Sequence, residues 1–302
     1  MRCHDAQPFE TLGSAERAKP LNVSMDPAKP LKKALAAEVV AMFNDRSRGE
    51  KPVVRRVDGL FGPKAVAWRV HGDVTTMLIG GVSGLLLQML HPAVLGGVWD
   101  HSNFRADMHG RLRRTARFIA LTTYGGREEA EAVIARVRRI HDVVRGTLPD
   151  GTPYAANDPA LLAWVHVTEA VSFLGAWIRY AEPRMSRNDQ DRYFAEMATV
   201  ATALGADPVP RTRREAELLI ETMRPQLRAD ERTREVAALV LDQRAPNPRI
   251  EPFQAATLNA GLDLLPGWAQ RMHGRAVSPL RRPLVRAGAY GIARTLRWAF
   301  AG

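Results

Sequence analysis

The feature that most constrains the fold is a stretch from Val74 to Trp99 that carries no formally charged side chain. It spans 26 residues, which is long enough for a membrane helix. Pro92 interrupts it, because proline lacks the N–H that a helix interior needs. Its apolar part, Met77 to Leu90, has only the length of a core helix. We therefore predict a buried core helix that ends near His91, with a membrane span as the alternative.

Two consecutive helices are predicted after this stretch. The first runs from Asp107, a suitable N-cap, to a Gly pair that ends at Gly126. The second covers Arg127–Gly146, where the apolar residues recur on one stripe at helical spacing. His141 lies within that stripe, so its imidazole is expected to point toward the core.

The chemistry of these helices centres on His141. Burial disfavours the imidazolium cation, so a core histidine tends to be neutral. A neutral imidazole in an apolar pocket is the proximal ligand of many iron porphyrins. Arg111 and Thr115 are four residues apart and share a face, and they offer a partner for a propionate and a hydroxyl for oxygen chemistry. From spacing alone, His141 also fits a core histidine that donates to a carbonyl, and the other two fit a solvated arginine and an ordinary helix threonine.

The order and spacing of several sequence pieces resemble one known family. The pieces are His91–Arg105, Arg111–Thr115, Ile140–His141 and Gly151–His166. Over residues 60–200, the chain is similar to the rubber oxygenase (latex-clearing protein)/MpaB oxygenase family.

This resemblance implies an all-helical, globin-like core that holds haem b and oxidative cleavage of carbon–carbon double bonds in isoprenoid chains. It places the proximal iron ligand on His141, and it places the arginine and threonine beside the haem on Arg111 and Thr115. The chain departs from the pattern at Arg114, where the latex-clearing protein has a lysine that can close the distal side. Arginine stays protonated and is a poor iron ligand. The family's acidic catalytic residue has no clear counterpart in this sequence.

Two other histidines have open alternatives. His91, at the end of the core helix, is either a distal-side group or base that faces bound oxygen, or a helix-terminal histidine bonded to a carbonyl. His166 and Glu169 are three residues apart on a helix predicted from Pro159 to Tyr180, so they share a face. A carboxylate-bridged di-iron bundle needs more ligands than this pair supplies, which makes a structural hydrogen bond the default interpretation.

The organisation of the chain follows from its periodicity. Helical periods succeed one another without strand alternation, so we predict an all-α fold with one domain over residues 31–302, after a disordered leader over residues 1–30. A first amphipathic helix is expected over residues 31–47. The single cysteine, Cys3, excludes a disulfide framework or zinc–thiolate site within the chain. The first residues lack Sec and twin-arginine features, so we expect a cytoplasmic location.

The C-terminal part of the chain is strongly basic. The net charge is +11, and residues 271–302 contain seven arginines and no acid, with Leu, Ile, Trp and Phe interleaved. Such a helix fits peripheral contact with an anionic membrane, or a helix packed on the domain with solvated arginines. Nucleic acid is not expected as a partner, because no recognition fold accompanies the charge.

Together these observations predict a haem b-dependent oxygenase, an oxidoreductase that uses dioxygen on an apolar small molecule, isoprenoid-like or aromatic. In this hypothesis His141 binds the iron, Arg111 holds a propionate, Thr115 bonds near the haem, and His91 joins Arg111 and Thr115 in catalysis. The alternatives are a non-catalytic haem-binding sensor or carrier, and a membrane-surface interaction protein.

Overall fold

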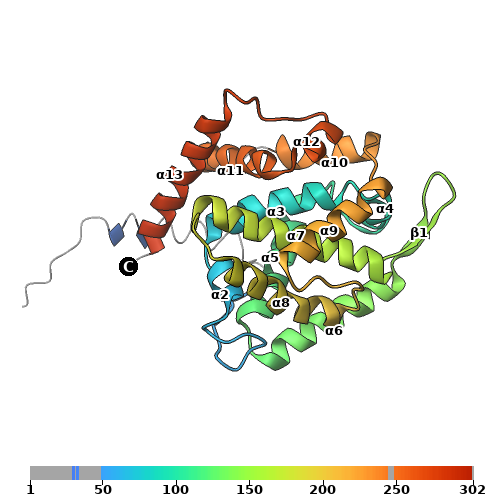
Figure 1. The fold of residues 1–302 in the computed structure, drawn as a ribbon, viewed down its shortest axis with the longest axis horizontal. Helices are drawn as coiled ribbons and strands as arrows, with labels where there is room; N and C mark the ends of the chain where they lie inside the picture. The colour runs from blue at the N-terminus through green and yellow to red at the C-terminus, as the bar shows by residue number, and fades with distance from the viewer. Residues whose placement is uncertain (1–28, 31, 34–48, 244–247, 301–302) are drawn as a thin grey trace, which may run out of the picture.

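The computed structural model describes residues 29–30, 32–33, 49–243 and 248–300, which form a helical bundle with one short strand pair (Figure 1). The α-helices are α2 (Val66–Val70), α3 (Val74–Gln88), α4 (Pro92–His101), α5 (Met108–Tyr124), α6 (Arg127–Val143), α7 (Pro159–Tyr180), α8 (Arg187–Leu204), α9 (Arg213–Met223), α10 (Glu231–Leu241), α11 (Glu251–Leu264), α12 (Gly267–Met272) and α13 (Arg282–Phe300). The shorter elements are the 3-10 turns η2 (Arg224–Gln226) and η3 (Pro248–Ile250) and the strands β1 (Arg145–Thr147) and β2 (Pro153–Ala155). The chain is therefore mostly helical, as predicted.

The N-terminal predictions fall largely outside this description. The leader predicted over residues 1–30 lies outside the described residues except for Lys29 and Pro30, which are helical. Of the helix predicted over residues 31–47, only Lys32 and Lys33 are described, and both are helical.

Helices α3 and α7 form the centre of the molecule. Helix α11 packs against α3, while α8 and α9 pack against α7. Figure 1 shows α11 and α12 along one edge of the bundle and α6 and α8 along the opposite edge. One hydrophobic cluster extends from Val66 in α2 to Val277 just before α13. Elements from most of the described chain thus share a core.

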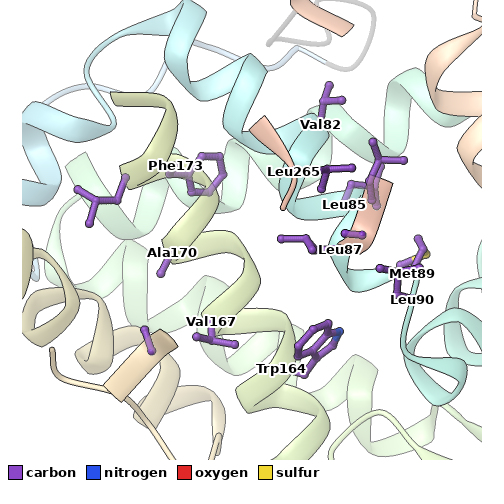
Figure 2. Packing of buried hydrophobic residues seen from close by; sticks show 14 of the residues in the cluster. Val82, Leu85, Leu87, Met89, Leu90, Trp164, Val167, Ala170, Phe173 and Leu265 are labelled. Atoms are coloured by element: carbon purple, nitrogen blue, oxygen red, sulfur yellow. The ribbon is translucent and has the colours of Figure 1, made fainter. Parts of the chain in front are cut away.

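The close approach of α3 to α7 depends on Gly80. A Cβ atom at this position would lie 2.7 Å from Phe173 Cδ1 and 2.9 Å from Phe173 Cα, closer than non-bonded carbon atoms pack. Figure 2 shows Phe173, Val167 and Trp164 along α7, with Leu87 of α3 on the facing side. The missing side chain at Gly80 therefore allows α7 to lie directly against α3.

The predicted break in the uncharged stretch is confirmed. Helix α3 begins after Asp73, whose carboxylate accepts the Thr76 N–H at 2.9 Å. It ends at Gln88, and α4 then starts at Pro92, bent away by 104°. Proline is well placed at a first helical position, because the N–H it lacks has no intrahelical partner there. Ile79, Leu85, Leu86 and Leu87 of α3 are buried, as a core helix requires.

Helix α7 also has the length and apolar composition of a membrane-spanning helix, and α3 with α4 passes the same test as a bent pair. However, 61% of the apolar window in α7 is buried inside the protein. Core packing therefore accounts for its composition.

The two consecutive helices form as α5 and α6, with one correction. Asp107 Oδ1 accepts the Gly110 N–H at 2.8 Å, which confirms the predicted N-cap. The second helix is shorter than predicted, because α6 ends at Val143 and β1 then pairs antiparallel with β2. The prediction of a helix as far as Gly146 is therefore wrong over its last residues, while the all-α class holds for the described chain. The strand pair is anchored by Tyr154, whose hydroxyl donates to the Asp100 carboxylate of α4 at 2.6 Å.

The predicted basic C-terminal helix is α13, and ion pairs fix its inner face to the bundle. The side chain of Asp263 in α11 is fully buried and lies 2.7 Å from Arg286 Nε and 3.3 Å from Arg282 Nε. Near the other end, Arg297 Nε lies 2.6 Å from an oxygen of Asp73. Several of the C-terminal arginines thus serve the packing of the helix.

Candidate functional site

A cavity lies between α5, α6, α7 and α8, and we call it the histidine cavity. Its polar lining residues are His71, His141, His166, Glu169 and Tyr193, with Thr122 at one side. The remaining walls are apolar and include Phe118, Leu162, Phe173, Met197 and Leu204. The cavity is small, with a volume of about 70 Å³.

His141 reaches the cavity from the last turns of α6. Its Nδ1 atom is buried and has no hydrogen-bond partner. Burial lowers the pKa of His141, while the nearby Asp142 charge opposes that shift. The imidazole is therefore neutral at physiological pH and keeps an unused ring nitrogen. The apolar stripe of α6 predicted that His141 points inward, and the structure places it in the lining of the cavity.

His166 and Glu169 reach the same cavity from adjacent turns of α7, which forms where it was predicted. Burial lowers the pKa of His166 to about 4, and His166 Nε2 is buried without a partner. Burial also raises the pKa of Glu169 to about 7, against an opposing contribution from Gln88. The default interpretation of a structural bond between the two does not hold, since no hydrogen bond joins His166 to Glu169 and Gln88 is the hydrogen-bond partner of Glu169.

Sequence reasoning missed the pair His71 and Tyr193. His71 follows α2, and its ring lies between the Thr123 hydroxyl at 2.8 Å and the Tyr193 hydroxyl at 2.9 Å. Burial lowers the pKa of His71 to about 3. Burial together with the charge of Glu169 raises the pKa of Tyr193, which places that carboxyl near the tyrosine. No local pattern marked these residues, because the partners are 52 and 122 positions apart.

Arg111 and Thr115 lie outside the cavity lining. They share a face of α5 with Phe118 and Thr122, one to three turns further toward the N-terminus of that helix. Arg111 Nη1 donates to Ser102 Oγ at 3.1 Å, and burial lowers the pKa of Arg111. Thr115 is exposed, and its hydroxyl donates to the Arg111 carbonyl at 3.3 Å. Their predicted roles beside a haem stay predictions.

Arg114, where the family pattern has lysine, is also absent from the cavity lining. Its Nη1 atom lies 3.3 Å from an Asp107 carboxylate oxygen, and the side chain is about half exposed. The contact ties the start of α5 together.

His91 is also placed apart from the histidine cavity. It is the N-cap of α4, with Nε2 3.4 Å from Gln226 Oε1 and the ring 6.3 Å from the Trp164 ring. Trp164 and His166 are two residues apart on α7 and project from different sides of it. His91 therefore contacts a side of α7 that does not line the cavity. Its Nδ1 is buried without a partner, so a role in chemistry stays a prediction.

A preformed protein-only metal site is absent from the described residues: no group of three or more His, Cys, Asp or Glu side chains is placed to hold one ion. His141 and His166 instead line one cavity from two different helices, and each keeps a buried ring nitrogen without a hydrogen-bond partner. Separate donors are what a cofactor that brings its own metal ligands would use.

A comparison with protein families decides the class of this protein. Residues 68–298 match the family described as ER-bound oxygenase mpaB/B′/Rubber oxygenase, catalytic domain. The chain belongs to this oxygenase family. No curated protein and no solved structure matched the chain.

The mpaB/rubber oxygenase match confirms the resemblance drawn from His91–Arg105, Arg111–Thr115 and Gly151–His166. The matched range contains every residue that lines the histidine cavity. An oxygenase catalytic domain is an oxidoreductase, so the broad activity class follows from the family. The family description names ER-bound members; a cytoplasmic location for this chain stays a prediction.

Proposed function

We propose that this mpaB/rubber oxygenase family member is a haem b-dependent oxygenase that oxidises or cleaves an apolar small molecule, isoprenoid-like or aromatic, with dioxygen as co-substrate. The observation that carries the proposal is His141, an imidazole that lines the cavity and whose buried Nδ1 atom has no hydrogen-bond partner. Neutral imidazole is a haem iron ligand, and histidine is the commonest metal-binding side chain. A globin-like core around the haem is part of this proposal.

The donor chemistry of the cavity fits haem, while its space is narrow. His141 supplies the iron ligand, and the apolar side chains of α5, α7 and α8 supply walls for a flat macrocycle. The cavity's room for water-sized molecules is about 70 Å³, so we expect the walls to open when haem binds. Haem binding should then stabilise the folded protein, as any ligand of the native state does.

Bound haem would supply activation of dioxygen, and the protein would supply exclusion of water and one proton carrier. Glu169 is our candidate for that carrier, because a carboxyl with a pKa of about 7 exchanges its proton at neutral pH. It lies in the cavity, whereas His91 does not. Arg111 would pair with a propionate, and Thr115 would bond near the edge of the haem, as the family resemblance implies.

The first test uses the full chain purified from haem-supplemented cells. We expect a Soret band, about one haem per chain in a pyridine haemochrome assay, and oxygen consumption when apolar alkenes are added. A purified chain that holds no haem and takes none up on titration would overturn the proposal. Haem without oxygen consumption for any apolar alkene or aromatic would favour the sensor or carrier alternative.

A further inference from the structure

The outer face of α13 is unusually apolar for a helix at the surface. Half of the large apolar side chains that are exposed in the described residues lie in the last part of the chain: Leu280, Leu284, Tyr290, Trp298 and Phe300. Leu280 and Leu284 are 89% and 74% exposed. Figure 1 shows α13 at the periphery of the bundle, crossing the end of α11. Burial within the described chain does not account for these side chains.

Two of the exposed large apolar residues of α13, Leu284 and Trp298, lie on one face of the helix. Ala289, Ala293 and Leu296 are buried and define the inner face of α13. On the opposite side, Leu284, Ala287, Gly291 and Trp298 follow one another at intervals of three, four and seven residues, and all are exposed. These intervals place residues on one face of a helix. Helix α13 therefore has a second apolar face that points to solvent.

The charge around this face has a single sign. Asp263 is the last acidic residue of the chain. Among the later arginines, Arg275, Arg282, Arg286 and Arg297 form ion pairs with acids of the bundle. Arg281 and Arg294, next to the apolar stripe, are exposed and form no ion pair within the described residues. Lys32 lies 5.1 Å from the centre of the Trp298 ring and adds a further positive charge there.

We propose that this face of α13 docks on an anionic lipid surface. Leu284 and Trp298 would enter the headgroup boundary, and Arg281 and Arg294 would lie against lipid phosphates. Amphipathic helices with Leu and Trp on one face and arginines beside it bind membrane surfaces in this orientation. Tryptophan also prefers the membrane–water interface.

The charge distribution favours lipid over a second copy of this chain as the occupant. A helix pair formed by two copies of α13 through this face would bring Arg281 and Arg294 of each copy close together, with no acid in the last 39 residues to offset them. Like charges in such an arrangement repel. An anionic membrane supplies the opposite charge along the whole helix.

The test measures binding of the full chain to lipid vesicles by co-sedimentation. We expect binding to vesicles that contain phosphatidylglycerol, weak binding to pure phosphatidylcholine, and loss of binding as salt is raised. Deletion of α13 is unsuitable, because Asp263 would lose two of its arginine partners. Point variants on the outer face avoid this.

Two variants and a control separate the contributions. The double variant L284E/W298E should abolish binding, and R294E should weaken it about thirtyfold, since it changes the charge by two units. The control is L218E, which places a glutamate at an apolar position of α9 that is 66% exposed and far along the chain from α13. Far-UV circular dichroism should be the same for all of them.

Three results would overturn the proposal. One is a wild-type chain that binds no anionic vesicles at low salt. Another is a double variant that binds as well as L218E does. The third is light scattering that finds a dimer which L284E/W298E dissociates, because the face would then be covered by a second copy. None of these readouts depends on haem, so the proposed oxygenase function is tested separately.

Discussion

Ionisable groups are buried in two regions of this molecule, and the two regions treat them in opposite ways. In the Asp263 cluster, one fully buried carboxylate has three cationic partners, Arg179, Arg282 and Arg286, from α7 and α13. In the histidine cavity, His141 and His166 each keep a buried ring nitrogen without a partner. Buried charges are normally paired, and buried polar atoms are normally hydrogen-bonded. The first region therefore pairs its buried charge within the chain, whereas the second keeps neutral imidazoles with a ring nitrogen that the chain does not use.

The largest effect on stability is expected in the Asp263 cluster. The variant D263N keeps the side-chain volume but leaves three guanidinium groups without their common anion. We expect the free energy of unfolding to fall by about 3 kcal/mol, the lower end for removal of one partner from a buried ion pair, because the three arginines are partly exposed. Urea unfolding followed by circular dichroism measures this.

The matched control for that variant is D242N. Asp242 pairs with Arg275 at 2.6 Å but is more than half exposed, so its loss should cost less than about 1 kcal/mol. Equal losses for the two variants would contradict the assignment of Asp263 as the cohesive centre.

The second largest effect on the free energy of unfolding is expected for the variant E169Q, and it depends on pH. Because folding raises the pKa of Glu169 from 4.5 to about 7, the folded protein binds this proton more tightly than the unfolded chain does. The stability that Glu169 contributes is therefore present at low pH and is lost as pH rises through this range. The variant E169Q does not titrate, so it should be more stable than wild type at alkaline pH.

The measurement is urea unfolding of wild type and E169Q at pH 5 and pH 8. The advantage of E169Q should grow between these pH values by on the order of 2 kcal/mol. Titration of His71 and His166 occurs in both proteins and cancels in the difference. A pH-independent difference would show that Glu169 is not buried as a neutral acid.

The smallest effect on the free energy of unfolding is expected for the contact between His71 and Tyr193 in the histidine cavity. The variant Y193F removes the hydroxyl that lies 2.9 Å from His71 Nε2 and leaves a buried ring nitrogen without its partner. We expect a loss of about 1 kcal/mol in the free energy of unfolding. The control Y290F changes an exposed tyrosine on α13 and should leave stability unchanged. If both variants match wild type, the His71–Tyr193 contact contributes nothing to the fold.

Much of the fold was predictable because it rests on local signals. The uncharged run before Pro92, the N-cap Asp107 and the apolar stripe through His141 each specify a helix from neighbouring residues, and the helices form there. The strand pair after α6 was not predicted. It has only three residues per strand and depends on the contact between Tyr154 and Asp100, 54 positions apart.

The candidate site was predictable in part. His141 was found because its position on a helix stripe indicates burial. His166 and Glu169 were identified as neighbours on one face of a helix. The sequence did not indicate that they share a cavity with His141. That depends on how α6, α7 and α8 pack. His71 follows α2 and Tyr193 lies on α8, so the two meet only in the folded protein and no spacing in the sequence indicates them.

The most direct test of the central claim is the haem content of H141A beside that of H109A and H166A, each purified in the same way from haem-supplemented cells. His109 is exposed on α5 and lies outside the cavity lining, which makes it the matched control. Our account predicts about one haem per chain in wild type and H109A and none in H141A, with unchanged helix content by circular dichroism. Full haem occupancy in H141A would contradict it, and if H166A alone lost haem, the iron ligand would be the imidazole of α7.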